Sequence, residues 1–231
     1  MKTLPRFTAS TALVVATMFA AIVTAGTLMK SPRVRAQSDR DDQESRIEQG
    51  FDIAPVPLNL EGENRALVGL GSYLVNAVAA CNDCHSAGPQ TQYEPGGNPF
   101  FGQPKKINPA TYLGGGQDFG ALLPTPGSPH IFSRNLTPDK TGLPEGGRSF
   151  SEFRQILRTG VDLDHLHPPC SPTVTTNCLP PPFDGNLLQI MPWPTFTNLS
   201  EHDIRAIYEY LSAIPCIEGP PPPSLLRNDC Q

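Results

Sequence analysis

The feature that most constrains this chain of 231 residues is a Cys-x-x-Cys-His motif, Cys81-Asn82-Asp83-Cys84-His85, which directly follows a predicted helix. Two cysteines three positions apart on one helical turn project the same way, so both can bond to one haem. The adjacent His85 can then turn its imidazole toward the iron. The motif therefore predicts one covalently attached haem c, bound through Cys81 and Cys84, with His85 as an axial ligand.

Other interpretations of the motif fit the sequence less well. A zinc site would require a second pair of ligands at close spacing, and Cys170 and Cys178 stand too far apart in the chain. A thioredoxin-like dithiol would require a strand before the motif, where an amphipathic helix is predicted. Structural disulfides would leave His85 unexplained.

The second axial ligand is predicted by elimination. Of the four methionines, Met191 is the one outside the N-terminal segment, and it lies in the rigid, apolar loop 189–194. The ordinary alternative for a single methionine is a filler of gaps in the core. The rival ligands are His130, His165 and His167. His202, in the first turn of the last predicted helix, is expected to face solvent, so we predict His85 and Met191 as the two axial ligands.

Apolar residues recur at helical spacing in three segments, about 63–80, 149–160 and 200–214. Ser149 and Glu152 form a capping-box pattern at the start of the second segment. Residues 86–147 and 168–182 are irregular and rich in Gly and Pro, and no strand is predicted. The pattern indicates a small all-α domain with long Gly/Pro-rich loops.

The N-terminus predicts export from the cytoplasm. Lys2 and Arg6 precede an apolar run from about Thr11 to Met29, and Val34-Arg35-Ala36 resembles a cleavage site. The run is also long enough to span a bilayer, so an uncleaved anchor that attaches the protein to the membrane is the competing interpretation. We predict an export signal or anchor at 1–36, a linker or extended arm at 37–62, the haem domain at 63–214 and a Pro-rich tail at 215–231, with a periplasmic or otherwise extracytoplasmic location.

The charge balance argues against nucleic acid as a partner. Residues 1–36 hold five of the 17 basic residues and none of the 22 acidic ones, so their removal leaves 12 against 22 and a net charge of −10. Such a surface favours basic partners, or it maintains solubility.

The four cysteines outside the motif are expected to form disulfides in an oxidising compartment. Three pairings are available, and proximity in the sequence favours Cys170–Cys178 and Cys216–Cys230.

Several segments together resemble a class I c-type cytochrome, and within that class the haem domains of cytochrome subunits of periplasmic alcohol, aldehyde and gluconate dehydrogenases. They occur in the matching order over roughly residues 63–214: Cys81-Asn82-Asp83-Cys84-His85; Asn135-Leu136-Thr137-Pro138-Asp139 with Thr141-Gly142; Phe153-x-x-x-Leu157-Arg158-Thr159-Gly160-Val161; Met191-Pro192-x-Pro194-x-Phe196-x-x-Leu199-Ser200; and Asp203-Ile204-x-Ala206-Ile207-Tyr208-x-Tyr210-Leu211.

The resemblance implies a fold in which the first and last helices cross, with Gly71 and Tyr208 as candidates for the crossing. It also implies a dehydrogenase as the redox partner. This chain departs from those subunits, which usually carry three such motifs, because it has one. It has Gly146-Gly147-Arg148-Ser149 where they tend to have a tryptophan, and Arg148 is either a partner of a haem propionate or an exposed loop residue. The Cys170–Cys178 loop is an insertion.

With both axial positions filled, no substrate can bind the iron, so the leading function is electron transfer, as a carrier or as the cytochrome subunit of a dehydrogenase. The chain is not expected to be an enzyme itself. The alternatives are a peroxidase-like haem enzyme or a haem sensor, and both require an open distal site. A sensor usually also carries a signalling domain, and diheme peroxidases need two motifs.

Overall fold

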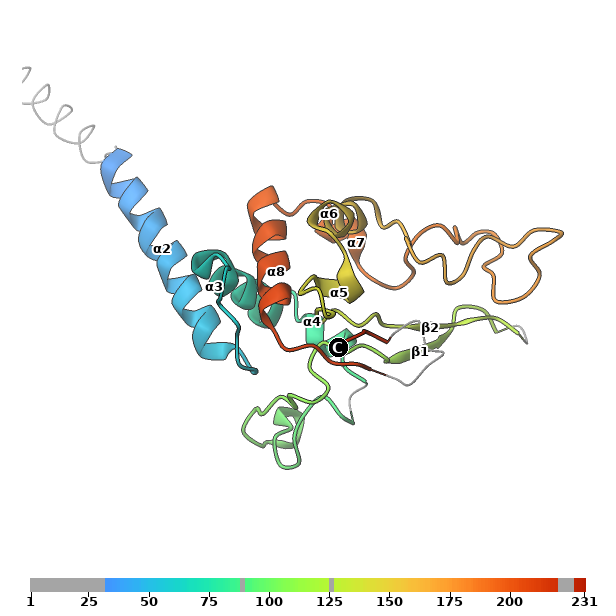
Figure 1. Cartoon of the computed structure of the whole chain (residues 1–231), viewed down its shortest axis with the longest axis horizontal. Helices are drawn as coiled ribbons and strands as arrows, with labels where there is room; N and C mark the ends of the chain where they lie inside the picture. The colour runs from blue at the N-terminus through green and yellow to red at the C-terminus, as the bar shows by residue number, and fades with distance from the viewer. Residues whose placement is uncertain (1–31, 88–89, 125–126, 220–226) are drawn as a thin grey trace, which may run out of the picture. The chain divides into compact units, whose positions relative to one another are not determined.

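The computed structural model describes residues 32–87, 90–124, 127–219 and 227–231 (Figure 1). The chain divides into two compact units, residues 1–44 and 45–231, and of the first unit only the start of helix α2 (Pro32–Ile53) is described. Most of the expected export signal or anchor and the proline run 220–223 lie outside the described residues. Among the helices that are described, none is both long and apolar enough to cross a membrane.

The end of α2 belongs to the second unit, so the expectation of a linker or extended arm over 37–62 is wrong there. This end of α2 packs on α3 (Arg65–Tyr73) through two glycines, because a Cβ at Gly50 would overlap the carbonyl oxygen of Gly69. The charged residues of α2 conceal this contact in the sequence, since close approach of two backbones leaves no hydrophobic periodicity.

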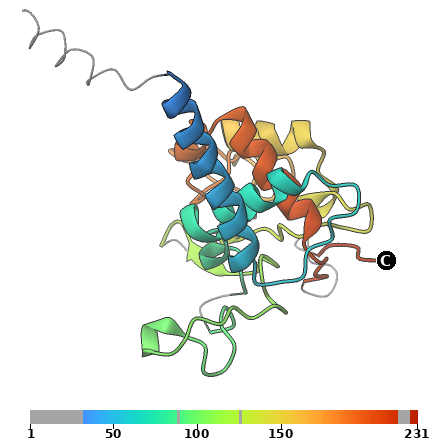
Figure 2. The same cartoon turned by 90° about the vertical axis from the view of Figure 1, so that its left-hand side faces the viewer.

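Helix α3 crosses the last helix, α8 (Glu201–Ala213), in an extensive contact (Figure 2). A Cβ at Gly71 would overlap the carbonyl oxygen of Ala206 and approach the Cβ of Tyr210 at 2.7 Å. The prediction that Gly71 lies at the crossing is therefore confirmed.

Tyr208 does not take the place predicted for it at the crossing with Gly71. Its ring packs against Phe150 and Phe153, with centroids 5.3 and 5.6 Å away, and its hydroxyl donates to the carbonyl of Arg148 over 3.0 Å. Because Tyr208 and Tyr210 are two positions apart on a helix, they point in different directions, and it is Tyr210 that meets α3.

A closed hydrogen-bond ring is buried beside the crossing. The Tyr112 hydroxyl donates to Asn76 Oδ1 over 2.6 Å, Asn76 Nδ2 donates to the Tyr210 hydroxyl over 3.2 Å, and the two hydroxyls lie 2.7 Å apart. Burial raises the pKa of both phenols, which therefore stay neutral donors. The ring satisfies polar groups that would otherwise be costly in the core.

The predicted helix over 63–80 is interrupted before the cysteine motif. After α3 the chain forms a π-helical turn, Leu74–Val78, and Ala80 then adopts a left-handed conformation with φ 49°. The motif follows as a separate short helix, α4 (Cys81–Cys84). A π-turn and a strained non-glycine residue are common next to functional sites.

The middle of the chain is mostly irregular, as predicted, with short elements between its loops. In chain order these are a 3-10 turn (Pro99–Phe101), β1 (Asp118–Ala121), β2 (His130–Phe132), α5 (Pro144–Gly147), α6 (Phe150–Thr159) and α7 (Trp193–Phe196). β1 and β2 form an antiparallel hairpin where no strand was predicted, because each is too short for alternation to be recognised.

Helices α6 and α8 begin at the residues that the sequence predicts. Ser149 and Glu152 form the predicted capping box of α6, and the side chain of Ser200 caps α8. The structure also contains both predicted disulfides, Cys170–Cys178 and Cys216–Cys230.

The C-terminal segment is held on the domain where a stiff tail was predicted. Asn135 donates to the carbonyl of Ile217 over 2.7 Å, and Asn228 donates to the carbonyl of Thr137 over 2.7 Å. The Asn135–Thr137 segment thus anchors the chain on both sides of residues 220–226.

We predict that Gly71→Ala lowers the free energy of unfolding by roughly 1–3 kcal/mol, because the added methyl group forces the two helix backbones apart. Chemical denaturation measures the change. Ala66→Gly, at an exposed position of the same helix, is the control for helix propensity. A Gly71→Ala protein as stable as the unchanged chain would contradict the close crossing.

A second prediction concerns Glu63, which lies beside Glu209 of α8. Burial, a hydrogen bond to Glu209 and repulsion by its charge raise the pKa of Glu63 from 4.5 to about 7. The folded state therefore binds the extra proton, and the free energy of unfolding falls as pH rises from about 4.5 through about 7. Glu63→Gln should equal the unchanged chain at about pH 4 and exceed it above about pH 7 in urea denaturation.

The exposed Glu61 provides the matched control, since Glu61→Gln should leave the pH dependence as it was. If the free energy of unfolding depends on pH in the same way for Glu63→Gln and for the unchanged chain, the proton shared by Glu63 and Glu209 is contradicted.

Candidate functional site

One large pocket is framed by the cysteine motif, α6, α8 and the loop before α7. The empty space in and above it amounts to about 1340 Å³, part of which is open to solvent. Its inner wall is apolar and is formed by Leu136, Phe153, Ile156, Leu157, Phe196, Leu199, Ile207 and Leu211. Polar groups enter this apolar space at a few points, which is typical of cofactor sites.

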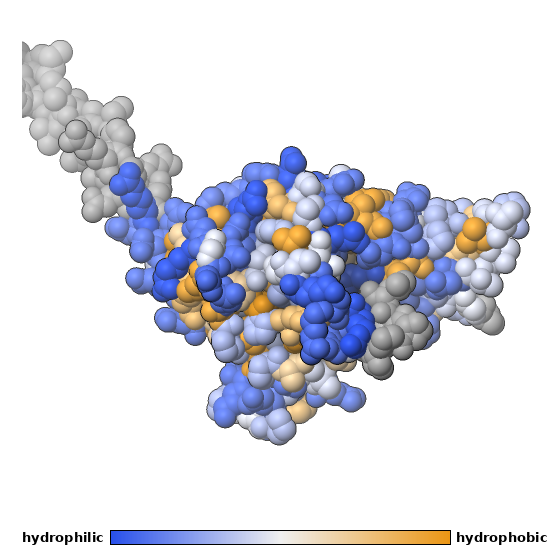
Figure 3. Space-filling view, in the orientation of Figure 1, coloured by the Kyte–Doolittle hydropathy of each residue, from blue (hydrophilic) through white to orange (hydrophobic). Residues whose placement is uncertain are grey.

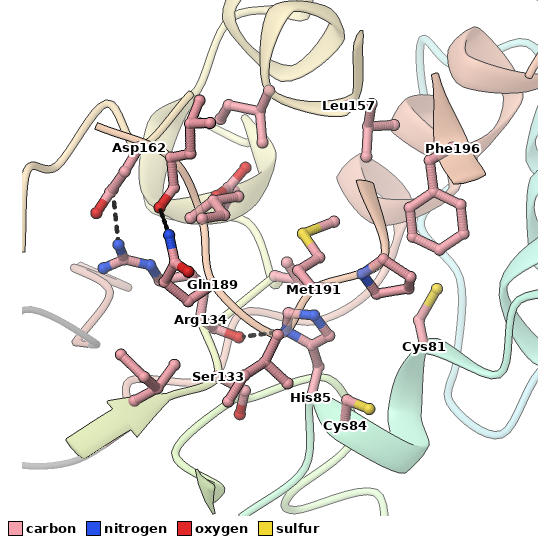
Figure 4. Close-up of a pocket in the computed structure, with 18 of the residues that line it drawn as sticks. Cys81, Cys84, His85, Ser133, Arg134, Leu157, Asp162, Gln189, Met191 and Phe196 are labelled. Atoms are coloured by element: carbon pink, nitrogen blue, oxygen red, sulfur yellow. Dashed lines mark hydrogen bonds and ion pairs between the residues drawn. The ribbon is translucent and has the colours of Figure 1, made fainter. Parts of the chain in front are cut away.

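Both cysteines of the motif line the pocket and carry free thiols. The left-handed turn at Ala80 redirects the chain so that α4 places them at the pocket's edge (Figure 4). Burial raises the pKa of Cys81 to about 12, and burial with the charge of Asp83 raises that of Cys84. A redox-active dithiol depends on a lowered pKa, so these thiols do not resemble one.

His85 is fixed by its backbone and by its ring. Its Nδ1 lies 2.8 Å from the carbonyl oxygen of Arg134, so Nδ1 carries the proton and Nε2 keeps a lone pair for a metal. Its own carbonyl accepts a bond of 2.8 Å from Gly115, whose φ of 67° and contact with Arg134 require glycine. Burial lowers the pKa of His85, which keeps the ring neutral and able to bind a metal.

Met191 reaches the same pocket from the loop before α7. Figure 4 shows its thioether and the imidazole of His85 pointing into one space. The preceding loop is tied to the end of α6, where Leu188 donates to the carbonyl of Gly160 over 2.7 Å. The Trp193 ring then packs on Gly160 and donates to the carbonyl of Leu188 over 3.2 Å. This loop orients Met191 through backbone bonds on both sides.

The rival histidines are distributed over the surface, with one exception. His130 pairs with Asp118 over 2.8 Å on the exposed hairpin, and His165 and His202 are exposed. His167 lines the pocket, and its Nδ1 lies 3.1 Å from Asn177 Oδ1. His167 is thus the one rival ligand that shares the pocket with His85 and Met191.

A cluster of charges at the pocket's edge was not found from the sequence. The guanidinium of Arg134 donates to the buried carboxylate of Asp162 over 2.8 Å and lies 3.4 Å from Asp164. Arg148 pairs with Asp164 as well and is partly buried, so it is not an exposed loop arginine, and its role beside a haem propionate stays a prediction. Arg134 and Asp162 are far apart in the sequence and no local pattern links them.

Glu145 completes this charged edge. It lines the pocket with φ 51°, an uncommon conformation for a residue with a side chain. Burial raises its pKa to about 7, although Arg134 and Arg148 act in the opposite direction. Glu145 is therefore a titrating group at the edge of the pocket.

The residues present fit a covalently attached haem. Two unpaired thiols on one helical turn, an imidazole with Nε2 free and a thioether in the same space supply the bonds, and the wall is apolar. A metal held by side chains alone fits less well, because no group of three or more His, Cys, Asp or Glu that could bind an ion occurs in the described ranges.

Comparison with known proteins gives one informative match. The chain is 31% identical over 150 residues to the gluconate 2-dehydrogenase cytochrome c subunit of Pantoea cypripedii. The match covers 64% of this chain and 23% of that subunit, so the chain corresponds to about a quarter of the relative's length. No protein-family model matches the chain. The match supports a cytochrome c-like relationship.

We predict that Asp162→Asn lowers the free energy of unfolding by about 1–3 kcal/mol, because Arg134 then loses its buried charge partner. The carboxylate also accepts the backbone N–H groups of Asp164 and Leu166, at 3.1 and 3.2 Å, so the loop beyond it should loosen. Denaturant titration measures the loss. The exposed Asp184→Asn is the control and should change stability by less than about 0.5 kcal/mol.

Proposed function

We propose that this chain is a monohaem c-type cytochrome that transfers electrons outside the cytoplasm and is not an enzyme itself. The observation that carries this proposal is the convergence of four side chains on one pocket: Cys81, Cys84, His85 and Met191. They come from two segments more than 100 residues apart in the sequence. Among the described residues of the domain, neither the free thiols nor the Nε2 lone pair of His85 has another evident use.

The proposed fold is that of a class I cytochrome c. The crossing of α3 and α8 at Gly71 supports it, as does the placement of the motif after the first of these helices and of the methionine before the second. The relative named a cytochrome c subunit supports the coarser statement, a cytochrome c-like relationship.

A bound haem would supply the one-electron couple of its iron. The chain's own residues would hold it. Cys81 and Cys84 would form the covalent links, His85 would bind the iron through Nε2, and Met191 would take the remaining axial position. The carbonyl of Arg134 would fix the His85 ring and increase its basicity.

The environment of the pocket sets the function. With both axial positions taken, no substrate could reach the metal, which favours electron transfer over catalysis. A thioether ligand raises the reduction potential compared with a second histidine, and the apolar wall excludes water. The chain's role is therefore to hold one redox centre with little rearrangement between its two oxidation states.

The proposed electron partner is a dehydrogenase in the same compartment. The relative in Pantoea cypripedii is named as a subunit of gluconate 2-dehydrogenase, and this chain matches a part of it. The predicted export signal at the N-terminus supports an exchange outside the cytoplasm.

Absorbance spectroscopy of the purified, haem-loaded protein tests the ligand assignment. We expect a low-spin spectrum, with the weak red band of thioether ligation in the oxidised form. Met191→Ala should abolish that band and lower the reduction potential, because the iron loses the ligand that stabilises its reduced state.

His167→Ala is the matched control, since it changes the rival residue in the same pocket, and it should leave the band in place. If Met191→Ala retains the band, or if the unchanged protein is high-spin and five-coordinate, the proposal of a six-coordinate electron carrier is wrong.

A further inference from the structure

Two neighbouring phenylalanines are the most exposed large apolar side chains in the described part of the chain. Phe100 is 84% exposed and Phe101 is 76% exposed. They lie in the 3-10 turn at the end of a projecting segment, residues 90–111, which we call the lobe (Figure 2). Single exposed apolar residues are ordinary, but an adjacent pair at the end of a projection indicates a contact surface.

The turn that displays the two rings is held by hydrogen bonds of its own. Asn98 accepts the backbone N–H of Phe100 over 3.0 Å, and its own N–H donates to the side chain of Gln103 over 2.9 Å. Gly102 closes the turn with φ 72° and donates to the carbonyl of Pro99 over 3.0 Å. The exposure of the rings is thus built into the fold of the lobe.

The lobe also differs from the rest of the chain in charge. Lys105 and Lys106 are exposed next to the turn, and Glu94 is the one acidic residue between positions 90 and 111. Without residues 1–36 the chain carries almost twice as many acidic as basic residues. The lobe is therefore a basic projection with an apolar end on an acidic protein.

The apolar end by itself is smaller than one side of a standard protein–protein interface. An aromatic side chain buries about 150–250 Å² at most, so the two rings supply well under the roughly 800 Å² that each partner contributes to a standard interface. On the face shown in Figure 3 the surface is mostly hydrophilic and its apolar residues form separate patches, so nothing visible enlarges this area. A bilayer surface demands no such matching area, because each ring enters the boundary between headgroups and acyl chains separately.

We propose that the lobe is a membrane-contacting finger, which inserts Phe100 and Phe101 into a bilayer surface that contains anionic phospholipid. Lys105 and Lys106 bind the phosphate-bearing headgroups, and their charge directs an otherwise acidic protein to that surface. The finger is separate from the pocket, since the described pocket lining includes no residue of the lobe. A chain bound this way keeps its pocket free for a redox partner, and the inference does not depend on haem being the group in the pocket.

A tryptophan placed at the end of the finger tests the proposal in the full-length, haem-loaded protein. The reporter is Phe100→Trp, with the signal of the native Trp193 measured in the unchanged chain and subtracted. On vesicles of phosphatidylcholine mixed with phosphatidylglycerol, its emission should shift to the blue and be quenched by brominated acyl chains. The readout is local, so it reports insertion of the finger even if the N-terminal segment also holds the chain on the vesicle.

Two further variants separate insertion of the finger from general adsorption and test the contribution of the two lysines. Val78→Trp reports from an apolar side chain that is 60% exposed outside the lobe, and it should show no shift. Adding Lys105→Gln and Lys106→Gln to Phe100→Trp should raise the lipid concentration for half the shift by roughly tenfold or more. Vesicles of phosphatidylcholine alone should have a similar effect.

Three results would overturn the proposal. The first is the absence of a shift for Phe100→Trp on the mixed vesicles. The second is an equal shift for Val78→Trp, which would indicate general adsorption. The third is a shift produced by raising the protein concentration without lipid, which would show that a second copy of the chain covers the finger.

Discussion

The close approach of α3 and α8 at Gly71 is the contact on which the arrangement of the pocket depends. It brings the backbone of one helix against the carbonyl of Ala206 in the other, and there is no room for a side chain between them. The cysteine motif follows α3 after the π-helical turn, and the loop that carries Met191 leads into α8 through the short α7. Because the two helices are locked together, the two segments that carry His85 and Met191 meet across one apolar space.

Polar contacts then fix what the helix crossing brings together. The carbonyl of Arg134 holds the His85 ring, and the Arg134 guanidinium is in turn held by the buried carboxylate of Asp162. On the other side, the loop before Met191 is bonded to Gly160 at the end of α6. The ligand candidates are thus held by main-chain and buried ionic contacts, which suits a centre that must change its charge with little movement.

Features encoded locally could be predicted from the sequence. The motif, the capping box at Ser149 and the disulfides depend on short spacing, and the apolar periodicity of α6 and α8 is strong. The position of Gly71 at the crossing followed from the resemblance to known cytochromes. Met191 was selected by elimination, and the structure places it in the pocket with His85.

Features that depend on distant parts of the chain could not be predicted. The packing of Gly50 on Gly69 leaves no hydrophobic pattern, so the end of α2 was taken for a linker. The pairing of Arg134 with Asp162 joins two loops that no motif connects. Tyr208 was predicted at the crossing, but Tyr210 lies there. The two tyrosines are two positions apart on α8, and the sequence pattern does not show which of them faces α3.

The central claim is that Cys81 and Cys84 hold one haem covalently. Intact-mass spectrometry of the protein as isolated from its native compartment, followed by peptide mapping, tests it most directly. The expected result is a mass increase of one haem, located on the peptide that contains both cysteines, with Cys170, Cys178, Cys216 and Cys230 in disulfides. A Cys81–Cys84 disulfide, or two free thiols without added mass, would contradict it.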